Sequence, residues 1–208
     1  PIAEALIAVS KALTVNSNEI RPSGELLDVG CGEGYYSARL AEALGMHLTG
    51  MDISREAVRC AAGKYKSGLW LCATASHIPV ADHSCDLLTS LFALTVPEEF
   101  KRVLRPEGYF LQVLAAEDHL LGLKSIIYDQ LIEKPKDTVP DVPGFTLVKS
   151  VPIRFPFTVE GEQVENLLSM TPHVFRIGHD GAQRLRETKT LTDTASCVLN
   201  VFRPVGNL

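Results

Sequence analysis

The chain has 208 residues, 46% of them hydrophobic, and a formal net charge of −5 at pH 7. This length is consistent with one α/β domain that has a sizeable core. The negative net charge argues against binding of long nucleic acid through overall electrostatic attraction. No apolar run is long enough to span a bilayer, and no basic segment precedes the first apolar stripe. The sequence therefore predicts neither a membrane span nor a secretory signal, and it predicts a cytoplasmic location.

An N-terminal helix is predicted over residues 1–20. Apolar side chains recur there at helical spacing from Ile2 to Leu13, which gives the helix a face that would cover a sheet. The segment Pro22-Ser-Gly24 would then form the loop into the first strand.

The most informative segment is a glycine-rich turn between a strand and a helix. Leu26–Val29 is a short apolar run, typical of a strand buried in a parallel sheet, and Tyr36–Leu44 has the helical period. Gly30, Gly32 and Gly34 lie between them. Because glycine has no Cβ, the chain can turn sharply there, and a ligand can lie against the backbone at the start of the helix.

The spacing of this turn favours one nucleotide cofactor. The dinucleotide fingerprint is G-x-G-x-x-G, whereas this turn reads G-x-G-x-G and has Asp28 two residues ahead. A carboxylate there suits a cationic ligand such as S-adenosylmethionine, which has an ammonium, a sulfonium and no phosphate. Asp52 follows the apolar run Leu48–Met51, where a ribose-binding carboxylate is expected. The alternative is a tight turn that binds no ligand.

Alternation of strands and helices continues beyond this turn. The predicted elements are the helix Arg55–Tyr65 with Ser54 as its N-cap, the strands Leu69–Ala73 and Cys85–Leu94, the helix Glu98–Leu104 opened by Pro97, the turn Arg105–Gly108 and the strand Tyr109–Ala115. Five such units predict an α/β fold with a parallel sheet.

The pattern changes after Ala116. We predict a helix over Asp118–Glu133, a loop over Lys134–Pro143, long strands over Phe145–Phe155 and Ala195–Phe202, and helices over Val159–Met170 and Gly181–Thr188. The resulting domain, 1–208, would comprise the N-terminal helix 1–20, a cofactor-binding core 21–135, and a substrate-side insertion with the final strands, 136–208. Five scattered cysteines without a C-x-x-C pair predict buried reduced thiols and no metal site.

These segments resemble a known family. With the glycine turn and Arg102–Gly108, the chain is similar to class I S-adenosylmethionine-dependent methyltransferases, which implies a Rossmann-like seven-stranded sheet with a C-terminal insertion. Five segments narrow this resemblance to the bacterial 23S ribosomal RNA (guanine-N1)-methyltransferases of the RlmA type. They are Asp28–Tyr36, Ala75–Pro79, His119–Tyr128, Gly144–Leu147 and Leu168–Pro172. The resemblance spans nearly the whole chain.

This resemblance implies methyl transfer to N1 of a guanine, with ribosomal RNA as the partner. The family has a four-cysteine zinc module ahead of its catalytic domain, and this chain starts at Pro1 without one, so we expect a fragment. Departures at Ala115–Glu117 and at Phe175, where the family often has tryptophan, leave the target nucleotide open. The oligomeric state is open too, and a homodimer is one alternative.

Eleven residues are predicted to bind the cofactor. They are Asp28, Gly30, Gly32, Glu33, Gly34, Tyr35, Asp52, Ile53, Thr74, Ala75 and His119. Asp52 would accept hydrogen bonds from both ribose hydroxyls, Ile53 would pack on adenine, and Thr74 would accept from the adenine amino group. The resemblance implies a cofactor contact for His119, and a solvent-facing histidine at a helix start is the alternative.

Methyl transfer needs alignment and exclusion of water more than a strong base. The proton on guanine N1 must nevertheless leave, and Glu117, Asp118 and His173 are candidate acceptors, each of which could equally be a solvated loop residue. Two other functions remain open: a small-molecule methyltransferase with the same core, and a cofactor-binding module that has lost catalysis.

Overall fold

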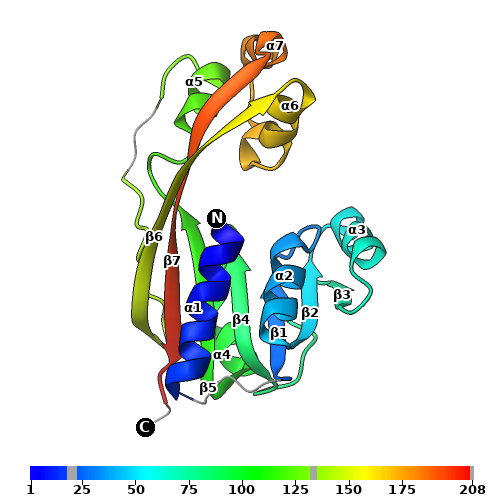
Figure 1. Ribbon diagram of the computed structural model, residues 1–208, viewed down its shortest axis with the longest axis vertical. Coiled ribbons are helices and arrows are strands. Elements are labelled where there is room, and N and C mark those ends of the chain that lie inside the picture. Colours follow the sequence, from blue (N-terminus) through cyan, green and yellow to red (C-terminus); the bar gives the residue numbers. More distant parts are fainter. Residues whose placement is uncertain (18–22, 132–134, 207–208) are drawn as a thin grey trace. The chain divides into compact units, whose positions relative to one another are not determined.

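The computed structural model describes residues 1–17, 23–131 and 135–206. Seven strands form one sheet in the order β3-β2-β1-β4-β5-β7-β6. The strands are β1 (Glu25–Val29), β2 (His47–Asp52), β3 (Leu69–Cys72), β4 (Cys85–Leu91), β5 (Leu104–Ala115), β6 (Phe145–Glu160) and β7 (Thr190–Pro204). The helices are α1 (Ile2–Ser17), α2 (Tyr35–Leu44), α3 (Arg55–Lys64), α4 (Pro97–Val103), α5 (Leu121–Ile127), α6 (Glu162–Ser169) and α7 (His179–Glu187), with a short 3₁₀ helix η1 (Pro172–Phe175) (Figure 1).

The first five strands pair in parallel, as the alternating pattern predicts. In the β4–β5 pair, Cys85 lies opposite Leu104 but Leu87 lies opposite Tyr109, so residues 105–108 bulge out of the ladder. The predicted turn at 105–108 is therefore a bulge within β5, and that strand begins earlier than expected.

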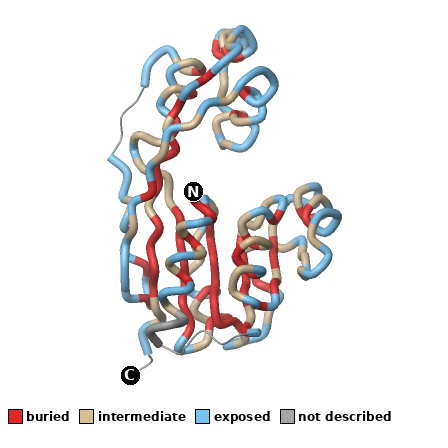
Figure 2. Tube along the Cα trace, in the orientation of Figure 1, coloured by how far each residue is buried: buried red, intermediate tan, exposed pale blue. Residues whose placement is uncertain are grey.

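The chain divides into two compact units. Unit 1 comprises residues 1–114, 139–151 and 198–208, and unit 2 comprises residues 115–138 and 152–197. Unit 1 contains strands β1 to β5, and β4 is buried along its whole length, as the red segments of Figure 2 show. Its core joins side chains from the sheet, from α4 and from two loops: Leu27, Val29, Met51, Ile78, Cys85, Leu88, Phe100, Val103, Leu104, Phe110, Val142, Phe145 and Phe202.

Within unit 1 the helices follow the sequence prediction closely. The structure confirms the N-terminal helix as far as Ser17, and it packs against α2. The predicted parts at 18–20 and 21–22 lie outside the described residues. Ser54 is the N-cap of α3 and accepts a hydrogen bond from the backbone N–H of Ala57 at 3.3 Å.

The cysteine prediction was only partly correct. All five cysteines are free thiols, but only Cys85 and Cys197 are buried. Cys72 is exposed, because β3 is the edge strand of the sheet and has a neighbour on one side only.

Unit 2 has its own apolar cluster, formed by Leu120, Leu123, Ile127, Val164, Leu168, Leu185 and Leu191. Its helix α5 is much shorter than the predicted helix 118–133, of which residues 132–133 lie outside the described residues. Leu120 has a left-handed φ of 55°, and the Asp193 carboxylate accepts the N–H groups of Gly122 and Leu123 at 3.1 and 2.7 Å. Asp193 therefore caps the helix and fixes where it begins.

Long strands replace parts of the predicted helical insert. Strand β6 continues to Glu160, and Gly161, with a φ of 56°, ends it before α6. Strand β7 begins at Thr190 instead of Ala195. The sequence prediction missed η1, a single 3₁₀ turn that Pro172 opens.

Candidate functional site

The glycine turn follows β1 and is tied to the end of β2. Gly30, Gly32 and Gly34 all have left-handed φ values, of +82°, +53° and +80°. The N–H groups of Gly30 and Cys31 both donate to the carbonyl oxygen of Met51, at 2.8 and 3.0 Å. This backbone tie holds the turn beside the carboxyl end of β2.

The three glycines are required for different reasons. A Cβ on Gly30 would lie 2.4 Å from the Cβ of Ala93, and a Cβ on Gly34 would lie 2.4 Å from the Trp70 ring. A Cβ on Gly32 would meet no atom within 4 Å. Gly30 and Gly34 therefore allow close packing, whereas Gly32 faces open space where a ligand can approach the backbone.

Asp52 lies at this open part of the turn. Its carboxylate accepts hydrogen bonds from the N–H groups of Gly32 and Ser54, both at 2.8 Å. The next side chain, Ile53, is 78% exposed. The structure thus brings Gly32, Asp52 and Ile53 together around the open space, a set that suits an adenosine sugar and ring, although their contact with the cofactor stays a prediction.

Asp28 has a different environment from the one expected for a residue that meets a cation. It is buried, and its carboxylate accepts hydrogen bonds from the hydroxyls of Ser37 and Thr89. Burial raises the pKa of Asp28 to about 6, although both hydroxyls act in the opposite direction. Asp28 therefore ties β1 to α2 and β4, and its predicted role toward the cofactor stays a prediction.

This burial predicts a pH-dependent stability. The pKa of Asp28 in the folded protein lies above that of an unfolded aspartate, so the folded state binds the Asp28 proton more tightly. This proton binding stabilises the folded state by about 3 kcal/mol below about pH 4, and the stabilisation is lost as the pH rises through about 6. Urea unfolding at pH 4 and pH 7 should show the wild type losing more stability than Asp28→Asn over this interval. Equal losses in both proteins would contradict the buried carboxylate.

The other predicted cofactor residues of unit 1 surround the turn or the end of β3. The Glu33 carboxylate pairs with Lys64, and the Tyr35 hydroxyl accepts from Arg39 at 2.6 Å. Thr74 shares a hydrogen bond of 3.0 Å with the Ser76 hydroxyl, in the loop after β3. Ala75 packs against the unit 1 core. None of these placements tests the predicted cofactor contacts.

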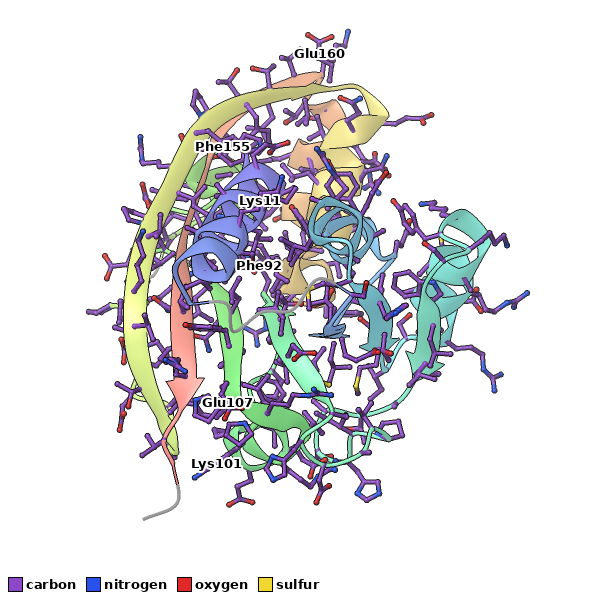
Figure 3. All side chains as sticks on the ribbon, turned by 60° about the horizontal axis from the view of Figure 1, so that its bottom comes forward. Lys11, Phe92, Lys101, Glu107, Phe155 and Glu160 are labelled. Carbon is purple, nitrogen blue, oxygen red and sulfur yellow. The ribbon has the colours of Figure 1, made fainter. Side chains whose placement is uncertain are left out.

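Two features beside the turn escaped the sequence prediction. The Trp70 ring donates to the carbonyl of Tyr65 at 2.9 Å and packs against Gly34 and Gly50. Phe92, which follows β4, has a left-handed φ of 55° and a side chain that is 45% exposed (Figure 3). Neither has a local sequence signal, because both depend on strands distant in sequence.

His119 belongs to unit 2, where it follows β5. Its Nδ1 accepts the N–H of Ser196 at 3.1 Å, and burial lowers its pKa, so the ring is neutral at neutral pH. The alternative of a solvent-facing histidine is therefore wrong. The implied cofactor contact of His119 stays a prediction.

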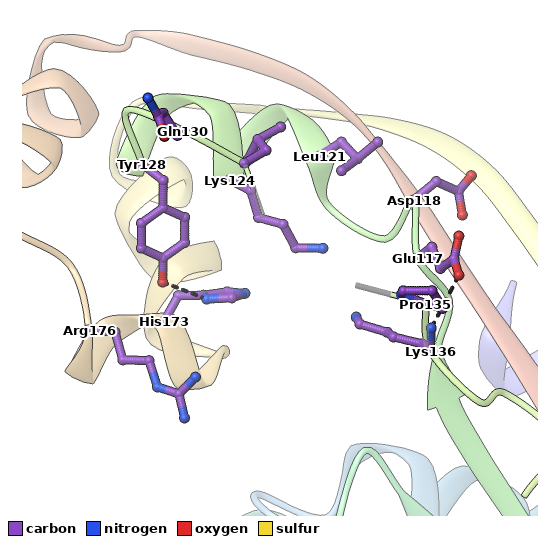
Figure 4. Close-up of a pocket in the computed structure, with 11 residues that line it drawn as sticks. Glu117, Asp118, Leu121, Lys124, Tyr128, Gln130, Pro135, Lys136, His173 and Arg176 are labelled. Carbon is purple, nitrogen blue, oxygen red and sulfur yellow. Dashed lines mark hydrogen bonds between the residues drawn. The ribbon is translucent and has the colours of Figure 1, made fainter. Parts of the chain in front are cut away.

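Unit 2 contains a pocket of about 710 Å³ that gathers all three candidate proton acceptors. Glu117, Asp118 and His173 line it, with Lys124, Tyr128, Lys136 and Arg176 among the other lining residues (Figure 4). Glu117 and Asp118 come from the segment before α5, whereas His173 comes from η1. The structure thus brings together three residues that were separate candidates in the sequence.

Each of the three acids or bases has a defined partner. The Nδ1 of His173 is 2.9 Å from the Tyr128 hydroxyl oxygen, and Glu117 accepts the N–H of Lys136 at 3.1 Å. Arg154 pairs with Asp118 at 3.0 Å, and a hydrogen bond with Ser196, followed by this ion pair, holds the pKa of Asp118 below its usual range. Asp118 is therefore an ionised, paired carboxylate and a poor acceptor.

His173 is better suited to accept a proton. Burial, followed by the charge of Lys124, lowers the pKa of its imidazole, which is therefore neutral at neutral pH. The sequence prediction missed Lys124 and Tyr128, although they are four residues apart within the helix predicted over 118–133, a spacing that puts two residues on one helix face and was a usable signal.

The described residues contain no group of three or more histidine, cysteine or acidic side chains that could hold a metal ion. Among the same residues, no helix has both the length and the apolar character of a bilayer-crossing segment.

Comparison with known proteins gives a consistent result. A family model described as a methyltransferase domain matches residues 27–112. YxjB of Bacillus subtilis, described as a candidate 23S rRNA (guanine-N1)-methyltransferase, is 27% identical over 79% of this chain. A 23S rRNA (guanine(748)-N1)-methyltransferase of Streptomyces fradiae is 27% identical over 86% of it. A demethylmenaquinone methyltransferase of Bacillus velezensis is 27% identical over 55% of each chain.

The chain spans 61% of the length of the Bacillus subtilis protein and 67% of that of the Streptomyces protein. A solved structure from Anaeromyxobacter dehalogenans, described as a candidate type II methyltransferase, shares the fold with a TM-score of 0.63 and 19% identity over 97% of each chain. The glycine turn, the ribose-side aspartate, the strand order and these matches agree. The chain therefore has the class I methyltransferase fold, and its residues 27–112 match a methyltransferase domain, for which S-adenosylmethionine is the cofactor.

Proposed function

We propose that this domain transfers a methyl group to N1 of a guanine in 23S ribosomal RNA. The observation that carries the proposal is the extent of similarity: the two rRNA guanine-N1 relatives match 79% and 86% of the chain, so both alignments extend into unit 2. The demethylmenaquinone relative matches only 55%. Because the substrate side varies most among enzymes that share this fold, similarity there bears on substrate choice.

The pocket of unit 2 supports this reaction. Bound S-adenosylmethionine supplies an electrophilic methyl group, so the protein has to align the acceptor nitrogen and take up its proton. His173 would accept the N1 proton at Nε2, because its Nδ1 already bonds the Tyr128 hydroxyl and its ring is neutral. Exposed apolar side chains close to His173 in sequence, Met170 and Phe175, are 81% and 90% exposed and are available to stack on bases.

The basic side chains of the last third give weaker support. Six of them carry a charge suited to RNA contact: Lys149, Arg154, Arg176, Arg184, Arg186 and Lys189. Arg154 and Arg184 pair with Asp118 and Asp129, at 3.0 and 2.8 Å. Two of the six are thus engaged within the protein, so RNA contact would depend on the others.

A small-molecule methyltransferase is the second candidate. The similarity to a demethylmenaquinone methyltransferase and the net charge of −5 favour it. A third function, a cofactor-binding module without catalysis, predicts cofactor binding with no transfer to any acceptor.

Labelled cofactor separates these functions. The protein should transfer a methyl group from labelled S-adenosylmethionine to unmodified 23S rRNA, and mass spectrometry of nuclease digests should identify 1-methylguanosine. Transfer to a quinone-type or other small acceptor with no label in RNA would overturn the proposal in favour of the second candidate. Cofactor binding with no transfer to RNA or to a metabolite panel would overturn it in favour of the third.

A further inference from the structure

The described lining of the pocket of unit 2 has an excess of positive charge. It contains three basic side chains, Lys124, Lys136 and Arg176, and two carboxylates, Glu117 and Asp118. Arg154, which is not among the lining residues, already pairs with Asp118 at 3.0 Å. Within the described lining, Glu117 is therefore the one carboxylate left to offset three basic side chains.

Two of these cations have no partner within the described residues. No hydrogen bond or ion pair joins the Lys124 ammonium or the Arg176 guanidinium to any described group, whereas the Lys136 ammonium lies 3.4 Å from the carbonyl oxygen of Ala116. Figure 4 shows Lys124 and Lys136 reaching into the same space from opposite sides, with Arg176 beside His173. Burial, followed by the charge of Lys136, lowers the pKa of Lys124, as expected for like charges that share a poorly solvated space.

Apolar groups also line the pocket. Leu121 and Leu131 line it and are each 41% exposed, and the Tyr128 ring and Pro135 add apolar surface, next to the polar Gln130. A pocket lined by both cations and apolar side chains suits an anion attached to an organic group. Its volume of about 710 Å³ is within the range of sites that hold ligands of nucleotide size.

We propose that Lys124, Arg176 and Lys136 bind a phosphate group of a nucleotide whose base lies against the Leu121, Leu131 and Tyr128 side of the same pocket. The choice of a guanine nucleotide rests on the proposed function. The phosphate site rests on the pocket alone. A guanidinium and two ammonium groups are the donors that proteins use for phosphate, since all are charged and have several N–H bonds. Lys124 is the central residue, because it is half-buried and has no hydrogen-bond or ion-pair partner among the described residues.

His173 reports on this site without any need for turnover. The groups that face its imidazole are Tyr128, Lys124, Lys136 and Arg176, and Glu117 and Asp118 line the same pocket. The three cations lower its pKa, so a bound phosphate, which offsets their charge, should raise it. Removing Lys124 should raise the pKa of His173 in the free protein as well.

The experiment follows the His173 ring by NMR while guanosine 5′-monophosphate is added to the whole chain. We expect saturable shifts, a higher His173 pKa in the complex, and a loss of affinity of about 10-fold or more in Lys124→Met. Methionine keeps the apolar stem and removes the charge. Lys66→Met is the control, because Lys66 is an exposed lysine of unit 1 that does not line the pocket, and it should bind as the wild type does.

Three results would overturn the inference. The first is no shift of His173 at about 10 mM nucleotide, a concentration that would detect even millimolar affinity. The second is equal affinity in folded Lys124→Met and wild type. The third is equal affinity for inorganic phosphate and the nucleotide, which would leave no role for the apolar wall. Lower S-adenosylmethionine affinity in Lys124→Met with unchanged nucleotide affinity would assign the cations to the cofactor carboxylate instead.

Failure here and failure of the proposed function are distinguishable. Methylation of 23S rRNA by the wild type, with the same KM in Lys124→Met, would retain the function and reject the phosphate site. Lys124-dependent nucleotide binding without methylation of RNA would retain the site and reject the function.

Discussion

Replacing Asp52 with alanine is expected to weaken S-adenosylmethionine binding by about 100-fold, because the two charge-assisted hydrogen bonds predicted between its carboxylate and the ribose hydroxyls would together contribute about 3 kcal/mol. The carboxylate lies beside Gly32, where the turn faces open space. Calorimetric titration with S-adenosylmethionine measures the effect directly.

Two further variants separate a binding effect from a local structural one. The Asp52 carboxylate also accepts the N–H groups of Gly32 and Ser54, so the alanine variant disturbs the turn. Asp52→Asn keeps one acceptor oxygen and should lose less affinity than the alanine variant. Glu56→Gln removes an exposed carboxylate in the first turn of α3 and should bind normally. Wild-type affinity in a folded Asp52→Ala protein would remove Asp52 from the cofactor site.

Alanine at Gly32 and alanine at Gly34 should have opposite dominant effects, although the glycines are two residues apart in one turn. At Gly34 the new Cβ would lie 2.4 Å from the Trp70 ring, with φ at +80°, and left-handed strain plus overpacking should cost about 3 kcal/mol of stability. At Gly32 the Cβ meets nothing within 4 Å, so the cost should be about 1 kcal/mol of backbone strain. The Gly32 variant should instead bind the cofactor at least about 10-fold more weakly, because the methyl group occupies the ligand's space.

The Trp70 ring cannot move aside cheaply for Gly34→Ala. Its Nε1–H donates to the Tyr65 carbonyl at 2.9 Å, and the other side of the ring contacts Gly50, where a Cβ would also lie 2.4 Å away. Urea unfolding and cofactor titration on both variants give the comparison. Similar losses of stability in the two variants would show that the Trp70 ring can move to accommodate the new methyl group. Wild-type cofactor affinity in Gly32→Ala would show that the cofactor does not occupy the open space beside Gly32.

Local pattern determined the first half of the fold. A buried apolar run, three glycines and a helical period predicted β1, the turn and α2, and Ser54 predicted the start of α3, because each signal acts within a few residues. The same reasoning placed Asp52 at the end of β2, and the side chain does lie at the glycine turn. Strand and helix alternation predicted the parallel pairing of β1 to β5.

Tertiary structure decided what depends on residues distant in sequence. Helix α5 begins at Leu121 because Asp193 of β7 accepts its first N–H groups, and no window of sequence joins positions about 70 residues apart. Likewise, Asp28 is a buried acid because Ser37 and Thr89 enclose it. Glu117, Lys124 and His173 share one pocket only because η1 and α5 pack within unit 2. Sequence by itself thus determined the glycine turn, whose parts are neighbours along the chain, whereas folding alone assembled the pocket of unit 2 from segments that are not.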